Sequence, residues 1–452
     1  MFRIYLIITL FIFGHNIILA QQNLCIQYRD TNLCYKKTFL INRSLEFERK
    51  IESIQDLRVY FTPLLADVDG DCVPDLIINS HRSDSVLFID SRSGITKGGF
   101  KKYFSDNGFN YLLVIDIDHD SVPEFISHTI TSFLDTTFYG DKLVCYKMDG
   151  TLLWVSDKRL NLAPTHGSAT GTIGAADFNQ DGIPEIYVSN KIFNAKTGVQ
   201  LTDGGLNGRG YNVPKNQDRA ITVAANLDID TTDLELAAGY TIYKIKINNL
   251  NGMTGNTMTP NNIKINGEFE DGVTSVADID QNGILDVIVS VQGFDSDPLV
   301  YAYYLNNGIP RFIASVNPVA SPNPGLRSRS ITLPTIGKID MTNSACILLS
   351  VNSKMYAYRF DGTNRLRLKW TLSHTDSSGS AESTLFDFNG DGIQEIIYRD
   401  ETHIRLIDGS TSTPRIIHQL PCLSPTYTEY PIVSDLDNTG EAKFCVTCAL
   451  SE

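Results

Sequence analysis

Oxygen-bearing side chains recur along the chain in a nine-residue pattern. The first copy spans residues 67–75 and reads DVDGDCVPD, with carboxylates at positions 1, 3, 5 and 9. Carboxylates crowded in this way repel one another unless a cation lies between them. A hard cation that accepts oxygen ligands in a flexible geometry fits the pattern, and calcium has that preference. The sequence therefore predicts calcium-binding loops.

Five copies of the pattern are well formed, and position 7 is counted as a further ligand position in each. The predicted metal ligands are Asp67, Asp69, Asp71, Val73, Asp75, Asp116, Asp118, Asp120, Val122, Glu124, Asp177, Asn179, Asp181, Ile183, Glu185, Asp278, Asp280, Asn282, Ile284, Asp286, Asp387, Asn389, Asp391, Ile393 and Glu395. At position 6 of the first two loops, Cys72 and Ser121 replace the usual glycine. We expect about five calcium ions with a mainly structural role, because a loop that recurs in every repeat serves the scaffold.

Three further copies depart from the pattern. The loop 226–235 contains an extra residue, so that Glu235 is misplaced as a ligand unless the loop bulges. A copy near residue 338 keeps only Asp340, and the last copy, from residue 435, has Lys443 where a ligand should stand. We expect the first of these sites to be doubtful and the other two to hold no ion.

The spacing of the loops indicates the architecture. They begin near residues 67, 116, 177, 226, 278, 338, 387 and 435, and a period of about 50 residues is typical of propellers, solenoids or arrays. Short apolar runs flank each loop, and a second hairpin with an Asp-Gly turn recurs between loops, for example at Asp149-Gly150. The sequence therefore predicts an all-β fold, a single β-propeller of seven to eight four-stranded blades with eight favoured. The calcium-binding loops should lie between the first two strands of most blades.

Two structural details follow from this interpretation. An EF-hand is excluded, because position 12 of the pattern is Ile78 in the first loop and Val188 in the third, where an EF-hand needs a bidentate Glu.

The last loop has no outer hairpin after it, so residues 33–50 are expected to complete the last blade. Ring closure of this kind would remove the open strand edges.

The N-terminus and the composition indicate an exported protein. Arg3, the apolar run 4–13 and a cleavage site after Ala20 predict a signal peptide over 1–20, followed by one propeller domain over 21–452. The apolar run is too short to span a membrane, and no transmembrane segment is expected. A net charge of −14 and a pI near 5.0 disfavour nucleic acid as a partner.

Eight cysteines in an exported chain are able to form disulfides. Cys25 with Cys34 is one expected pair, and Cys422 with either Cys445 or Cys448 is another. The spacing alone does not choose between the two partners of Cys422.

The repeated loop followed by an apolar strand resembles the FG-GAP repeat, also called the integrin α-like or VCBS repeat. Residues 67–446 carry the resemblance, and the segment Phe386–Glu395 is similar to repeats in secreted FG-GAP proteins of gliding bacteria. The resemblance implies a calcium-stabilised propeller used in adhesion or ligand binding, and it implies no reaction.

Two functions from different classes remain open. The first is a secreted or cell-surface protein, not an enzyme, that binds an extracellular glycan or protein ligand. The second is a calcium-dependent polysaccharide lyase of the pectin type on an eight-bladed propeller, which would need Lys, Arg or Tyr bases beside the ion. The sequence contains no H-E-x-x-H or G-x-S-x-G motif. We name no catalytic residue and no cofactor other than calcium.

Overall fold

The computed structural model describes residues 62–79, 85–102, 111–129, 142–160, 170–210, 219–230, 232–263, 270–292, 297–318, 331–376, 381–424 and 430–448. Within these ranges every regular element is a β-strand, and none of the residues belongs to a helix that could cross a membrane. The predicted signal peptide, Cys25, Cys34 and the strands expected over residues 33–50 lie outside the described residues and stay predictions.

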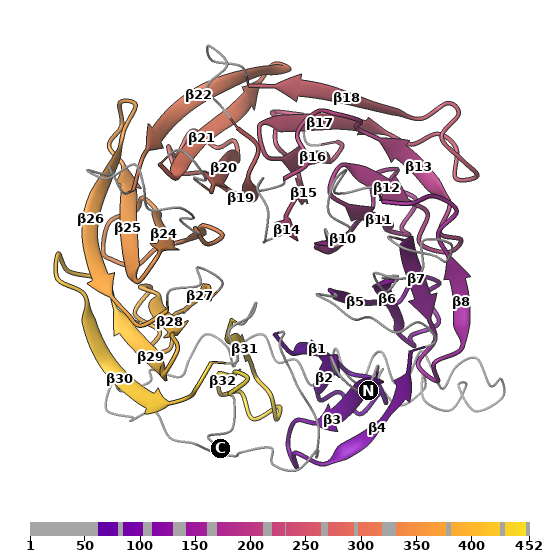
Figure 1. Cartoon of the computed structure of the whole chain (residues 1–452), viewed down its shortest axis with the longest axis horizontal. Coiled ribbons are helices and arrows are strands. Elements are labelled where there is room, and N and C mark those ends of the chain that lie inside the picture. The colour runs from indigo at the N-terminus through magenta and orange to yellow at the C-terminus, as the bar shows by residue number, and fades with distance from the viewer. Residues whose placement is uncertain are drawn as a thin grey trace, which may run out of the picture.

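Seven four-stranded antiparallel sheets follow one another around a ring, which confirms the predicted all-β propeller (Figure 1). Within each sheet the strands neighbour one another in chain order. The blades consist of β1 (Leu64–Ala66), β2 (Asp75–Asn79), β3 (Ser85–Asp90) and β4 (Thr96–Lys101); β5 (Leu112–Ile115), β6 (Glu124–Thr129), β7 (Lys142–Tyr146) and β8 (Leu152–Val155); β10 (Ile173–Ala176), β11 (Glu185–Val188), β12 (Lys191–Phe193) and β13 (Gln200–Asp203); β15 (Val223–Ala225), β16 (Glu235–Ala238), β17 (Thr241–Lys246) and β18 (Thr257–Asn262); β19 (Val273–Ala277), β20 (Asp286–Val291), β21 (Leu299–Asn306) and β22 (Ile309–Val316); β23 (Thr335–Gly337), β24 (Cys346–Val351), β25 (Lys354–Phe360) and β26 (Leu366–Ser373); β27 (Ser383–Phe386), β28 (Glu395–Arg399), β29 (His403–Asp408) and β30 (Arg415–Pro421).

The position of a strand within its blade explains its sequence. The second strands β6, β20 and β24 are buried along their whole length, because both faces of each blade pack against neighbouring blades. β20 and β24 therefore read as nearly continuous apolar runs rather than as an alternating pattern, whereas β6 also buries Ser127, His128 and Thr129. The outermost strand β4 is almost entirely exposed. The core consequently lies between the blades.

Two tryptophans each form a hydrogen bond from their own blade to the next blade along the chain. The indole Nε1 of Trp154, on β8, donates to the carbonyl oxygen of Ala195 at 2.9 Å. Trp370, on β26, donates in the same way to Gly409 at 2.9 Å. Both indoles are buried, so each adds apolar contact as well as one satisfied donor.

A smaller sheet occupies the remaining place in the ring. It consists of β31 (Ile432–Ser434) and β32 (Lys443–Cys445) and lies between the seventh blade and the first (Figure 1). Ile432 and Cys445 pack against a core cluster of the first blade. The structure thus describes seven complete blades and two strands at an eighth position. A further pair of short strands, β9 (Thr170–Gly171) and β14 (Arg219–Ala220), forms a parallel sheet.

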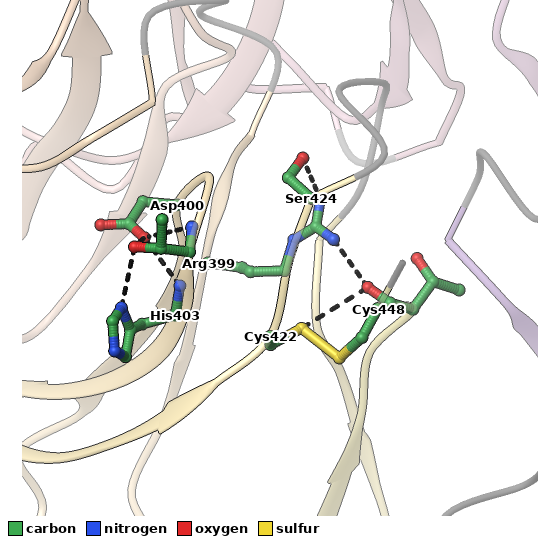
Figure 2. Close-up of a disulfide and its surroundings, with 8 residues drawn as sticks. Arg399, Asp400, His403, Cys422, Ser424 and Cys448 are labelled. Atoms are coloured by element: carbon green, nitrogen blue, oxygen red, sulfur yellow. Dashed lines mark hydrogen bonds between the residues drawn. A yellow bond between two sulfur atoms is a disulfide. The ribbon is translucent and has the colours of Figure 1, made fainter. Parts of the chain in front are cut away.

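A disulfide ties this small sheet to the seventh blade. Cys422, just after β30, is bonded to Cys448, just after β32, with 5.1 Å between their Cα atoms (Figure 2). The buried Arg399 lies beside it and donates to the carbonyl of Thr447 at 2.6 Å and to the hydroxyl of Ser424 at 2.9 Å. Of the two expected partners of Cys422, Cys448 is confirmed, and Cys445 is a free thiol.

A second disulfide involves the first acidic loop, 67–75. Cys72 is also disulfide-bonded, and its partner lies outside the described residues. The predicted pair Cys25–Cys34 lies outside them as well.

Candidate metal loops

All eight acidic loops connect the first strand of a sheet to the second, as predicted. The loop 67–75, for example, leads from β1 to β2, whose residues Ala66 and Asp75 are paired. Because the blades repeat around one ring, the loops lie on the same face of it. Neighbouring loops touch: the imidazole Nε2 of His119, in loop 116–124, is 2.8 Å from the carbonyl oxygen of Gly182, in loop 177–185.

In the five well-formed loops and in the last loop, the carboxylate at position 1 closes the turn. In loop 278–286, Asp278 Oδ1 accepts a hydrogen bond from the amide of Asn282 at 3.0 Å, and its Oδ2 accepts one from Gly283 at 2.9 Å. The residue at position 6 has a positive φ, which explains the usual glycine there. Cys72 and Ser121 adopt the same conformation, with φ of 66° and 71°. The two departures from glycine therefore leave the turn unchanged.

The carboxylate at position 9 is buried at the start of the second strand. One of its oxygens accepts a hydrogen bond from the amide of position 2. The donor–acceptor pairs are Val68 with Asp75 at 3.2 Å, Ile117 with Glu124 at 3.0 Å, Phe178 with Glu185 at 2.9 Å, Leu227 with Glu235 at 2.9 Å, Ile279 with Asp286 at 2.8 Å and Phe388 with Glu395 at 2.9 Å. The apolar side chain at position 2 thereby anchors the loop in the core.

At Asp286, the second oxygen of the position-9 carboxylate is available to a cation. Asp286 is fully buried, and its Oδ1 has no hydrogen-bond partner among the described residues. The side-chain oxygens of Asp278, Asp280 and Asp286 come within 4.8 Å of one another, as do those of Asp116, Asp118 and Glu124. A buried and unpaired carboxylate oxygen is costly, and a cation between these oxygens removes the cost. The residues present therefore fit a metal ion.

Burial and mutual repulsion shift the pKa values of the position-9 carboxylates. Burial first, and then the nearby Asp280 and Asp278, raise the pKa of Asp286 to about 8 against the hydrogen bond from Ile279. Burial likewise raises the pKa of Glu185 and of Glu395 to about 7. Near neutral pH these groups hold a proton part of the time unless a cation stabilises the charged form.

Two well-formed loops carry Asn at position 3. Asn179 Oδ1 accepts a hydrogen bond from the amide of Asp181 at 2.9 Å, so an amide oxygen occupies the place of a carboxylate oxygen. In the loop 387–395, the side-chain amide of Asn389 donates to Glu395 Oε1 at 3.0 Å. Both loops keep an oxygen at each predicted ligand position.

The loop 226–235 differs from the expectation. Glu235 Oε2 accepts from the amide of Leu227 as in every regular loop, so the extra residue does not displace this carboxylate. The extra length also places Asp233 close to Asp228 and Glu235, with side-chain oxygens within 4.8 Å of one another. Sequence reasoning missed Asp233. In the sequence, the one indication of this additional ligand is that Asp233 is an acidic residue two positions before Glu235.

Basic side chains lie inside four of the loops. Lys97 Nζ is 2.9 Å from Asp75 Oδ1, and Lys244 Nζ is 2.6 Å from Asp228 Oδ2. Further basic contacts are from Arg92 to Asp71 at 2.5 Å, from Arg359 and Lys369 to Asp340, at 2.6 and 2.8 Å, and from Lys443 to Asp437, at 2.6 Å. Among the described residues, no ion pair reaches the carboxylates of loops 116–124, 177–185, 278–286 and 387–395.

Comparison with known proteins finds one curated relative. No protein-family model matches the chain. A protein of Plasmodium yoelii yoelii, described as a T-cell immunomodulatory protein homolog, is 24% identical over 314 residues. The match covers 60% of this chain and 42% of that protein, so the chain spans less than half the length of the relative.

Among solved structures, the V. cholerae biofilm matrix protein Bap1 matches with a TM-score of 0.54 at 14% identity. The match covers 86% of this chain and 85% of that one. A rhamnogalacturonan lyase of Bacillus licheniformis is 15% identical over 84% of this chain and 64% of its own, but its TM-score of 0.33 is too low to carry an argument. The comparisons support the propeller fold, and the FG-GAP resemblance continues to rest on the loops.

Proposed function

We propose that this protein is a secreted, calcium-binding β-propeller of the FG-GAP type. It would recognise an extracellular glycan or protein in cell-surface adhesion, and it would catalyse no reaction. One observation carries the calcium part of the proposal: the buried Asp286 presents an unpaired carboxylate oxygen to two further carboxylates. A hard divalent cation is the partner that satisfies all three.

The same architecture supports calcium in four loops: 116–124, 177–185, 278–286 and 387–395. In each, the side chains at positions 1, 3, 5 and 9 would bind the ion together with position 7. The carboxylates at positions 1 and 9 already hold the turn and the second strand in place through backbone hydrogen bonds. An ion bound between them would stabilise the scaffold, because a ligand that binds only the folded state favours folding.

Secretion is supported by two features of the chain. The disulfide Cys422–Cys448 belongs to an oxidising compartment, since thiols in the cytosol are kept reduced. The predicted signal peptide over residues 1–20 points to the same destination. A rigid ring braced by disulfides and ions suits a protein that presents a binding surface outside the cell.

A glycan array in calcium buffer, run in parallel with excess chelator, tests recognition. We expect binding that needs calcium and disappears when the protein is heat-denatured. An absorbance assay for unsaturated sugar products, run on the polysaccharides that bind, tests the absence of catalysis. Accumulation of such products would overturn the non-enzymatic proposal in favour of the lyase. Failure to bind glycans and extracellular matrix proteins alike would overturn recognition.

A further inference from the structure

Half of the acidic loops contain a cation supplied by the chain itself. We propose that a lysine or arginine side chain takes the place of the metal in these loops, and that Lys97 in particular replaces calcium in the well-formed loop 67–75. This inference rests on the proposed calcium binding by the other four loops. It changes the expected number of ions from about five to four.

The position of Lys97 resembles that of a coordinated ion. Its Nζ lies 2.7 Å from Asp69 Oδ2, 3.4 Å from Asp71 Oδ2, 2.9 Å from Asp75 Oδ1 and 3.3 Å from Asp90 Oδ2. Positions 3, 5 and 9 of the loop therefore all contact one ammonium group. The side chain of Lys97 is 22% exposed, so the ammonium is largely enclosed by the loop.

The contrast with loop 278–286 is direct. Asp75 and Asp286 occupy the same position and are both fully buried. Neither Asp75 Oδ1 nor Asp286 Oδ1 accepts a hydrogen bond among the described residues, but Asp75 Oδ1 forms an ion pair with Lys97 at 2.9 Å, whereas no ion pair within the described ranges reaches Asp286. Burial raises the pKa of both carboxyls; at Asp75 the contacts with Lys97 oppose the rise, whereas at Asp286 only the backbone hydrogen bonds of Ile279 and Asp280 do so.

In the other three loops a basic side chain also lies among the carboxylates, but it comes from a different position in the blade. Lys244, on β17, is directly opposite Glu235 in the ladder between β16 and β17. Asp340 is held by two basic residues from β25 and β26, and Lys443 stands at position 9 itself. The basic residue comes from a different place in the blade each time. What the loops share is a positive charge among the carboxylates.

Competition explains why the tethered ammonium excludes the ion. A calcium ion in loop 67–75 would have to displace Lys97 from four carboxylates. Calcium sites in extracellular modules bind with dissociation constants of roughly 10⁻⁴ to 10⁻³ M. A group tethered within the same blade has an effective concentration in the mM range or above. Calcium must therefore first displace a tethered competitor, which weakens its apparent affinity for this loop below that of the loops without a basic side chain.

The test is a gain of metal binding. Lys97→Ala removes the ammonium and leaves space, while the exposed Lys101 on the same strand provides the matched control Lys101→Ala. Calcium bound per chain is counted by equilibrium dialysis. We expect the Lys97→Ala variant to bind one ion more than wild type, and the control to bind the same number as wild type. An unchanged count for Lys97→Ala would overturn the inference.

Stability in chelator separates this inference from the proposed function. Without calcium, Lys97→Ala should melt at a lower temperature than Lys101→Ala, because Asp69 and Asp75 lose the basic partner that they have among the described residues, while Arg92 still pairs with Asp71. Added calcium should reverse the loss. Equal melting in chelator would overturn the role of Lys97 even if wild type binds calcium. Wild-type protein that binds no ion would overturn the proposed function. The melting comparison in chelator between Lys97→Ala and Lys101→Ala would still show whether Lys97 stabilises its loop. If Lys97→Ala does not fold, the calcium count and the melting comparison are made instead on Lys244→Ala, which removes the basic side chain from loop 226–235.

Discussion

The backbone amide of Tyr430 donates a hydrogen bond to the hydroxyl of Thr62, 3.0 Å away, across 368 residues of sequence. The hydroxyl of Ser91 bonds to the carbonyl of Leu436 at the same junction. These contacts join the small sheet β31–β32 to the first blade and so close the ring (Figure 1). Stability at the two ends of the described chain is therefore coupled.

Thr62→Val tests this closure. Loss of one hydrogen bond worth about 1 kcal/mol should raise the exchange rate of the Tyr430 amide roughly fivefold. Hydrogen exchange with mass spectrometry measures it over residues 430–445. The exposed Thr257 on β18 gives the control Thr257→Val, for which no change is expected there. Equal protection in both variants would show that the junction does not depend on this contact.

The disulfide should hold the small sheet to the seventh blade. Cys422→Ala is expected to lower the free energy of unfolding by about 3 kcal/mol, because Cys422 and Cys448 are 26 residues apart and their bond restricts the unfolded chain. Urea unfolding measures the loss. A reductant should lower the stability of wild type by more than that of the Cys422→Ala variant, in which the disulfide of Cys72 is still present to be reduced. Equal stability of variant and wild type without reductant would contradict this role.

The raised pKa values predict how stability depends on pH without calcium. Burial raises the pKa of Asp286 to about 8 and those of Glu185 and Glu395 to about 7, so the folded state keeps protons that the unfolded state has already lost. Their stabilising contribution is complete below pH 4 and is lost as the pH rises through these values. The buried His128 acts in the opposite direction, because burial lowers its pKa to about 4, but that contribution is complete above about pH 6.5.

The free energy of unfolding in calcium-free buffer should therefore fall between pH 6.5 and pH 8. Saturating calcium should remove most of this decline, since the ion replaces the protons. Urea unfolding at several pH values, with and without calcium, makes the comparison. Stability that rises with pH over this window without calcium would refute the assigned protonation.

Two aspartates in different loops should respond differently to calcium. Asp286→Asn weakens a proposed metal site, so it should reduce the increase in melting temperature that calcium causes. Asp340→Asn instead leaves Arg359 and Lys369 without their shared carboxylate, which should cost on the order of 1–3 kcal/mol with or without calcium. Thermal melting of both variants, with calcium and with chelator, distinguishes them. The same calcium dependence in both would mean that basic residues do not mark the metal-free loops.

The sequence predicted what is local in the chain. Each loop is contiguous, with its ligands at fixed positions and an apolar residue at position 2, so the loop and the two strands beside it could be inferred from the printed pattern. The position of Lys97 among the carboxylates of loop 67–75 could not be inferred from the sequence. It lies on the fourth strand, and a register shift between Phe88 and Ile89 in β3 determines which residues of β4 approach the loop.

The cysteines show the same limit. Cys445 and Cys448 are close in sequence, and only the packing of β32 separates their roles. Cys445 packs in the cluster beneath the first blade, whereas Cys448 lies beyond the strand, where it meets Cys422 (Figure 2). The count of blades was limited in a similar way, since the last repeat supplies only two strands among the described residues.

The number of calcium ions bound by the wild-type chain tests the central claim most directly. The chain is stripped with chelator, dialysed against about 1 mM free calcium, a concentration suited to extracellular sites, and its metal content is determined by atomic absorption. We predict four ions per chain, one for each loop without a basic side chain of its own: 116–124, 177–185, 278–286 and 387–395. A chain that binds no calcium under these conditions would contradict the account.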